Sequence, residues 1–161
     1  MKTRLTEIRW GVIFSLVTLL WLWLEQLVGL HGPYIAHHAT YTNLFAIPAI
    51  TIYVLALRQK KWRDYNGVMS WKQGIIAGLL ITLVVALISP ASQWLFHSMI
   101  SPQYFSNVRA YAVAQNMMSS EEAAAYFNLP SYIKQSVLGA FVMGTVTSVI
   151  VAFFLRTRTR P

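Results

Sequence analysis

Four long apolar stretches, almost free of charged residues, constrain this chain more than any other feature. They cover residues 10–30, 41–57, 74–97 and 133–155, approximately. An α-helix needs roughly 20 mostly apolar residues to cross about 30 Å of hydrocarbon. Charged residues make up only 11% of the chain, whereas a soluble domain has about 25% to cover its surface. We therefore predict an all-α, polytopic integral membrane protein built as a four-helix bundle.

The four predicted spans differ in how regular they are. The first begins at Trp10, contains Glu25, and lacks a small-x-small cleavage site, so we expect an uncleaved span and not a signal peptide. The second is short, and Pro48 removes a helix hydrogen bond near its middle. The third contains Pro90, which predicts a kink or a break near Ser89. The fourth span is the most clearly defined of the four after the first.

The basic residues predict how the spans are oriented. Eleven of the 13 Lys and Arg residues lie before span one, between spans two and three, or after span four. They are Lys2, Arg4, Arg9, Arg58, Lys60, Lys61, Arg63, Lys72, Arg156, Arg158 and Arg160. Because basic residues are retained in the cytoplasm, both termini and a basic loop at 58–73 are predicted to be cytoplasmic. The net charge of +8 then reflects topology, and we expect membrane lipids and not nucleic acid as partners.

Spans three and four each carry a row of small residues at steps of four. Such rows let helices approach closely in lipid. The rows are Gly74, Gly78, Thr82, Ala86 and Pro90 in span three, and Ser136, Ala140, Gly144, Ser148 and Ala152 in span four. The GxxxG that opens the first row also fits self-association or contact with another membrane protein. Because two rows in one chain can satisfy each other, we favour packing of span three on span four.

The long outer connection, residues 101–132, is predicted to form two amphipathic helices. The first begins after Ser101 and Pro102 and runs to about Met118, and the second begins at Ser119 or Ser120 and is closed by Pro130. We expect this connection at the outer membrane interface. The aromatic residues expected to dip toward lipid are Tyr104, Phe105, Tyr111 and Phe127. A re-entrant segment or a partner-binding cap has a similar pattern.

The candidate functional residues are few and lie toward the outer side. Glu25 is the acid inside an apolar run, so it is a functional candidate. We favour a salt bridge or hydrogen bond from Glu25 to Lys134, Arg109 or His97, with a proton or substrate path as the alternative. The histidines at positions 31, 37, 38 and 97 also map to this side. Imidazole and carboxylate suit Zn²⁺ or a proton relay, but the spacing is no established metal signature. We therefore assign no metal, no cofactor and no catalytic residue.

Several segments together resemble a known family. They are LALRQKK at the end of span two, NGVMSWKQGIIAGLLITLVVALI at span three, SSEEAAAYFNLP in the outer connection and FFLRTRTR after span four. The chain resembles the bacterial four-span proteins catalogued as domain-of-unknown-function family 4199. The resemblance implies a bacterial inner-membrane location and this architecture. The family has no accepted activity, so it implies no functional residues.

The expected function follows from abundant packing surfaces and scarce reactive groups. We expect a small, non-enzymatic inner-membrane protein that binds a lipid or a protein partner. The alternative is a permeation path for an ion, a proton or a small molecule that uses Glu25 and the outer histidines. A lipid-modifying enzyme would require convergent polar groups, which the sequence does not indicate.

Overall fold

The computed structural model describes residues 4–157, which form helices and turns and contain no strand. The elements are α1 (Leu5–Leu27), α2 (Ile35–Tyr41), the 3-10 turn η1 (Thr42–Phe45), α3 (Ala46–Asp64), α4 (Trp71–Leu95), the π-helical turn η2 (Phe96–Ile100), α5 (Tyr104–Ala114), α6 (Ser120–Tyr126) and α7 (Leu129–Leu155). The predicted all-helical class is thus confirmed. The predicted basic residues Lys2, Arg158 and Arg160 lie outside the described residues.

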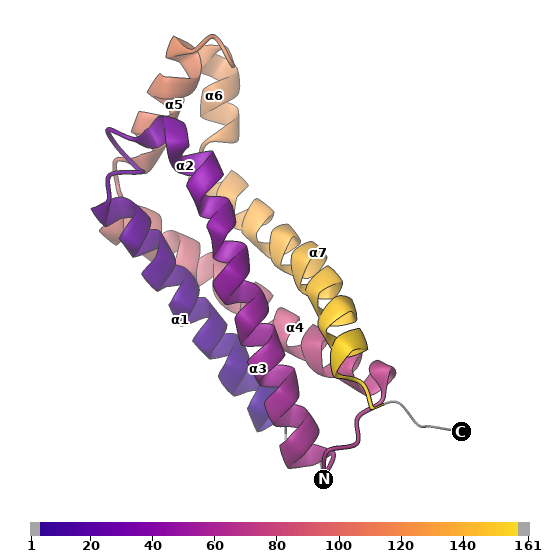
Figure 1. Cartoon of the computed structure of the whole chain (residues 1–161). Coiled ribbons are helices and arrows are strands. Elements are labelled where there is room, and N and C mark those ends of the chain that lie inside the picture. The colour runs from indigo at the N-terminus through magenta and orange to yellow at the C-terminus, as the bar shows by residue number, and fades with distance from the viewer. Residues whose placement is uncertain (1–3, 158–161) are drawn as a thin grey trace.

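Four segments are long and apolar enough to cross a membrane: Leu5–Leu27, Ile35–Asp64, Trp71–Ile100 and Leu129–Leu155. Their long helices run side by side, and α2, α5 and α6 gather at one end (Figure 1). We call this the loop end, and the opposite end, where α1 and α4 begin and α3 and α7 finish, the basic end. Lys61 of α3 donates to the carbonyl oxygen of Leu155 in α7 over 2.9 Å at the basic end. Both ends of the described chain therefore lie at the same end of the bundle.

Helices α4 and α7 share the most extensive contact of any pair of elements in the described chain. Their rows of small residues face each other in antiparallel order. A Cβ added to Gly74 would lie 2.7 Å from the Cβ of Ala152, and one added to Gly78 would overlap Ser148. These glycines let the two backbones approach more closely than side chains would allow.

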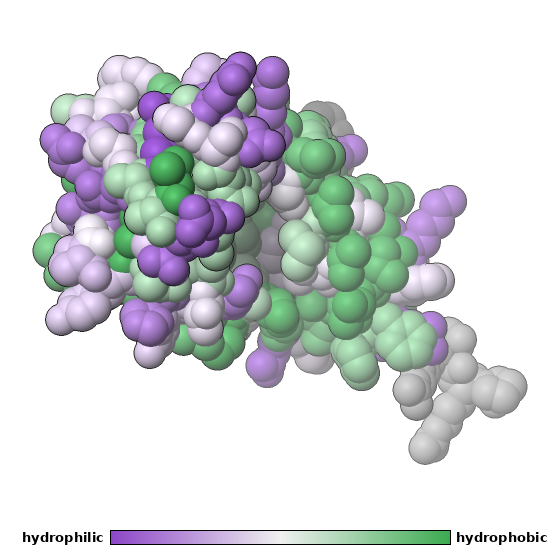
Figure 2. Space-filling model, turned by 90° about the horizontal axis from the view of Figure 1, so that it is seen from above, coloured by the Kyte–Doolittle hydropathy of each residue, from purple (hydrophilic) through white to green (hydrophobic). Residues whose placement is uncertain are grey.

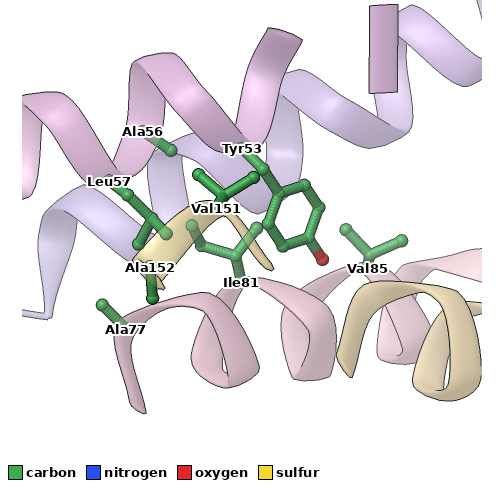
Figure 3. Packing of buried hydrophobic residues seen from close by; sticks show 8 residues of the cluster. All are labelled: Tyr53, Ala56, Leu57, Ala77, Ile81, Val85, Val151 and Ala152. Atoms are coloured by element: carbon green, nitrogen blue, oxygen red, sulfur yellow. The ribbon is translucent and has the colours of Figure 1, made fainter. Parts of the chain in front are cut away.

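The buried apolar core lies between α3, α4 and α7, toward the basic end (Figure 3). Its members are Tyr53, Ala56, Leu57, Ala77, Ile81, Val85, Val151 and Ala152. Tyr53 and Thr82 share a hydrogen bond of 2.8 Å between their hydroxyl oxygens inside this core. The polar end of Tyr53 is thus satisfied without water.

The two prolines have milder effects than the sequence predicted. Helix α4 continues through Pro90 without a break. Pro90 cannot donate to the carbonyl of Ala86, and the hydroxyl of Ser89 donates to that oxygen instead, over 3.0 Å. Pro48 lies near the middle of the Ile35–Asp64 span, as predicted, and falls in the first turn of α3, directly after the 3-10 turn η1.

Helix α3 extends seven residues past the predicted end of span two, to Asp64, so the predicted basic loop at 58–73 is helical in its first half. Lys60 is buried within this extension. Its ammonium lies 2.8 Å from Glu7 of α1 and 2.5 Å from Asp64, one turn further along α3. All three side chains are buried. One buried ammonium thus holds two buried carboxylates, within a helical extension where the sequence indicated solvated, basic chain.

At the loop end, α5 begins at Tyr104 and not at the predicted Ser101–Pro102 signal. Ser119 caps α6 in a capping box with Glu122, near the predicted start. Pro130, predicted to close α6, instead lies in the first turn of α7. Seen from this end, hydrophilic residues gather over the nearest elements, and hydrophobic residues cover the helices beside and behind them (Figure 2).

Candidate functional site

A carboxylate and two imidazoles meet beneath the loop end. Glu25 is in the last turn of α1, His31 is in the loop that follows, and His38 is in α2. Glu25 Oε2 lies 3.4 Å from the Nε2 atoms of both His31 and His38. We call these three residues the Glu–His cluster. Glu25 and His31 are buried, with exposed side-chain fractions of 3% and 1%, and His38 is half-buried at 18%.

The local chain path explains why these residues meet. Gly29 has a φ of +83°, a conformation that glycine adopts without steric cost. The N–H of Leu30 donates to the carbonyl of Glu25 over 3.0 Å, so the chain reverses directly after α1. This reversal turns His31 back against the last turn of α1. The carbonyl of His31 also accepts from the side-chain amide of Asn107 in α5, over 2.8 Å.

Neighbouring polar groups fix the other side of each cluster residue. Trp21 donates its indole N–H to Glu25 Oε1 over 2.6 Å. Gln26 Oε1 lies 3.1 Å from His31 Nδ1 and also accepts from the hydroxyl of Ser101 over 2.8 Å. Because an amide oxygen only accepts, the proton of neutral His31 is on Nδ1. Its Nε2 lone pair is then directed at Glu25.

Tyr104 closes the cluster from the α5 side. Its hydroxyl lies 3.5 Å from Nδ1 of His38 and 3.0 Å from the hydroxyl of Tyr132 in α7. The sequence predicted that Tyr104 would dip toward lipid, but it is only 3% exposed. Burial, reinforced by Tyr132 and by the charge of Glu25, raises the pKa of Tyr104 above its ordinary value. Its hydroxyl therefore keeps its proton at neutral pH.

The other predicted candidates lie elsewhere. Buried His97 places Nε2 3.1 Å from Gln93 Oε1 and stacks on Phe105 at 4.2 Å between ring centroids. Arg109 donates its Nε–H to the carbonyl of Phe127 over 2.7 Å, and Lys134 is exposed. In residues 4–157, the hydrogen-bond and ion-pair partners of Glu25 are Trp21 and the two cluster histidines, instead of these three residues.

A cavity of about 360 Å³ lies between the four long helices, nearer the bundle centre than the Glu–His cluster. Its inner wall includes the buried residues Ser15, Val85 and Ser92 from α1 and α4. Its rim includes Ile50 of α3 and Met143 of α7, which are 48% and 63% exposed. The cavity therefore opens sideways between α3 and α7, through the wall of the bundle.

The cavity wall is mostly apolar because its hydroxyl groups bond to their own helices. Ser15 donates to the carbonyl of Gly11, Thr18 to that of Phe14 and Ser136 to that of Ile133, over 2.9–3.0 Å. Such bonds leave the aliphatic atoms of the side chain to line the space. Gln93 is a lining residue whose amide oxygen is already used by His97.

Residues 9–157 match the family described as "Protein of unknown function (DUF4199)". The chain belongs to this family. The DUF4199 match includes both the Glu–His cluster and the residues that line the cavity. No curated protein and no solved structure matches the chain. The function of this DUF4199 protein must therefore be argued from its own geometry.

Sequence reasoning placed Glu25 and all four histidines at one end of the bundle but did not select His31 and His38 as its partners. It also missed Trp21, Gln26 and Tyr104. The available signal was the spacing of Trp21 and Glu25, which puts them on one helix face. A second signal was Gly29, which allows the tight reversal before His31.

Proposed function

We propose that this protein is a membrane component that binds the acyl chain of a lipid in the cavity, and that it acts by binding and not by catalysis. The observation that carries the proposal is the sideways opening of the cavity between α3 and α7. In a helix bundle that spans a membrane, such an opening faces hydrocarbon. An acyl chain is then the molecule at the mouth of the cavity.

The residues around the opening of the cavity support an acyl chain as its ligand. Ile47 of α3 and Val146 of α7, each three positions along its helix from a rim residue, are 68% and 48% exposed. Large exposed apolar side chains suit contact with lipid tails and not with water. Thr42 and Asn43 line the cavity toward the loop end. They lie where the ester groups of a lipid inserted from that side would be.

The volume of the cavity is also in the range of small-molecule binding sites. Small-molecule sites are typically about 300–1,000 Å³, and this cavity measures about 360 Å³. An empty apolar space forfeits dispersion contacts along its whole wall. Filling it with part of a hydrocarbon chain restores these contacts and uses no reactive group.

The proposal includes a location and an orientation. The basic end carries Arg58, Lys61 and Arg63 of α3 and Lys72 of α4. By the positive-inside rule, this end would face the cytoplasm of a bacterial cell and the Glu–His cluster would lie on the outer side of the inner membrane. The lipid would then enter from the outer half of the bilayer.

Permeation, the alternative function, has less support. Beneath the cavity, the Tyr53–Thr82 hydrogen bond and the buried side chain of Ile81 separate it from the basic end. A hydrated path for an ion would have to cross this apolar core. Self-association through the GxxxG of α4 is also less favoured, because Gly74 and Gly78 are already used against α7.

Photo-crosslinking tests the proposal. The purified protein is reconstituted into nanodiscs that contain a phospholipid with a diazirine in its acyl chain, and labelled peptides are mapped by mass spectrometry. We expect stronger labelling of cavity residues such as Phe14 and Ser92 than of Leu87, which is 72% exposed on the outer surface of α4. Labelling of Leu87 without labelling of the cavity residues would overturn the proposal.

A pair of variants on α7 provides the control. Gly139 lines the cavity, and a Cβ added there has no atom within 4 Å, so Gly139→Phe places a ring toward open space. Leu138→Phe adds a ring at a position that is 65% exposed and is not in the cavity lining. Gly139→Phe should suppress labelling of Phe14 and Ser92, and Leu138→Phe should leave it unchanged. Equal labelling in both variants contradicts binding in the cavity.

A further inference from the structure

The Glu–His cluster has three atoms whose bonding is incomplete. Glu25 Oε2, His31 Nε2 and His38 Nε2 are buried, and none of them has a hydrogen-bond partner. All three lie within 4.8 Å of one another. Buried polar atoms generally have a hydrogen-bond partner, so three in one place call for an explanation. Three potential ligand atoms this close together could hold one metal ion between them.

We propose that Glu25 Oε2, His31 Nε2 and His38 Nε2 bind a divalent transition-metal ion of the Zn²⁺ class. This site is independent of the acyl-chain cavity. It takes three protein ligands, two imidazoles and one carboxylate, and leaves a fourth position for water or an external ligand. Such a set suits Zn²⁺, which accepts nitrogen and oxygen donors in tetrahedral geometry.

The two distances from Glu25 to the histidines are compatible with tetrahedral binding. With metal–ligand bonds of about 2.1 Å at tetrahedral angles, two ligand atoms lie ~3.4 Å apart. Glu25 Oε2 lies 3.4 Å from each histidine Nε2. These separations are long for hydrogen bonds, but they leave room for a metal ion between the carboxylate and each ring.

The atoms behind the ligands are arranged as in metal centres. Ligating histidines generally donate their other N–H to an oxygen, which fixes the ring and raises its basicity. His31 Nδ1 faces Gln26 Oε1 at 3.1 Å, and His38 Nδ1 faces the hydroxyl of Tyr104 at 3.5 Å. Trp21 holds the second oxygen of Glu25. Each of the three ligands is therefore held in place by a contact on the side that faces away from the proposed metal ion.

The environment favours a borderline metal over a hard one. Mg²⁺ and Ca²⁺ prefer six or more oxygen ligands, whereas this site offers two nitrogens and one carboxylate. The chain contains no cysteine, so no thiolate competes for the ion. His38 is the most exposed of the three ligands, so the site is least shielded from solvent on the side of α2.

Metal binding to the full-length protein tests this inference. The protein is purified in detergent with an affinity tag that contains no histidine and is dialysed against Zn²⁺ alone. We expect about one Zn²⁺ per chain, no binding of Mg²⁺, and the visible absorption of tetrahedral Co²⁺ when Co²⁺ replaces Zn²⁺. A wild-type protein that binds less than about half an equivalent of Zn²⁺, or that binds Mg²⁺ equally well, overturns the proposal.

Histidine variants assign the ion to this site. His38→Gln should weaken Zn²⁺ binding by at least ~100-fold, since loss of a mere supporting group typically costs 10–100-fold. His37→Gln is the matched control, because His37 is the adjacent residue on α2 and its ring lies beside Tyr41, outside the cluster. It should bind as the wild type does. Equal losses in the two variants contradict the assignment.

A stability measurement separates lost binding from misfolding. Zn²⁺ should raise the Tm of the wild type and of His37→Gln, because a ligand that binds only the folded state stabilises it. It should not raise the Tm of Glu25→Gln or His38→Gln. Both variants must first show wild-type helix content by circular dichroism. A Tm increase that persists in a folded His38→Gln variant places the ion elsewhere and refutes the site.

Discussion

Alanine substitutions at two glycines distinguish the effect of α4–α7 packing on stability from the effect of helix propensity. Replacing a glycine inside a helix with alanine gains about 1 kcal/mol when the new methyl group has room. At Gly139 no atom lies within 4 Å of the added Cβ. Gly139→Ala should therefore stabilise the protein by roughly that amount.

At Gly78 the steric cost of the added methyl group outweighs the same gain in helix propensity. The added Cβ would overlap the hydroxyl of Ser148 and lie 2.5 Å from its Cβ and 3.2 Å from its Cα. Ser148 is fully buried, and its hydroxyl donates to the carbonyl of Gly144 over 2.6 Å. Overpacking costs about 1–3 kcal/mol, and the disturbed hydrogen bond about 1 kcal/mol more. After subtraction of the propensity gain, Gly78→Ala should lose about 1–3 kcal/mol.

The assay is reversible unfolding in mixed micelles, with the unfolding free energy extrapolated from circular dichroism. The double variant Gly78→Ala, Ser148→Gly removes the hydroxymethyl group that the new methyl group would overlap and should recover part of the loss. The reasoning is refuted if Gly78→Ala is as stable as Gly139→Ala. It is also refuted if Ser148→Gly gives no recovery in the Gly78→Ala background.

Two further predictions concern charged groups. Lys60→Met leaves Glu7 and Asp64 buried without their cation and should lower the free energy of unfolding by about 3–5 kcal/mol. The control, Arg58→Met at an exposed position, should change it by less than about 0.5 kcal/mol. Equal unfolding free energies in the two variants would contradict the role of the ion pairs. Hydrogen bonds from Ser119 lower the pKa of Glu122 from 4.5, so the cap is complete above that pH and is lost as the pH falls through the lower, folded value. Amide protection factors in the first turn of α6, corrected for the intrinsic pH dependence of exchange, should fall over that range in the wild type but not in Glu122→Gln, and a pH-independent protection factor in the wild type would disprove the assignment.

The architecture was predictable because the bilayer imposes it. A span must be long and almost uncharged, so residues 74–97 and 133–155 indicated membrane helices without any knowledge of their neighbours. The structure gives these helices slightly different bounds, Trp71–Leu95 and Leu129–Leu155. The helix ends differ because they are set by capping interactions, such as the capping box of Ser70 with Gln73, and composition does not reveal these.

The partners of buried polar groups were harder to predict, because they depend on how segments far apart in sequence are placed. Lys60 was expected at a solvated interface, but it meets Glu7 only because α3 runs alongside α1. Tyr104 was expected to face lipid, and its burial depends on where α5 lies relative to α2. Glu25 could be recognised as unusual from the sequence, but the turn at Gly29 determines which histidine reaches it.

The ion pairs at the basic end also bear on how the chain is made. Glu7 leaves the ribosome about fifty residues before Lys60, which at about 5–20 residues per second is a delay of roughly 3–10 seconds. During that interval the nascent first helix holds an acid whose permanent counter-ion has not yet been synthesised. The ion pair that joins α1 to α3 can therefore form only after α3 has been made, so α1 reaches its full stability in the bundle later than its place in the chain suggests.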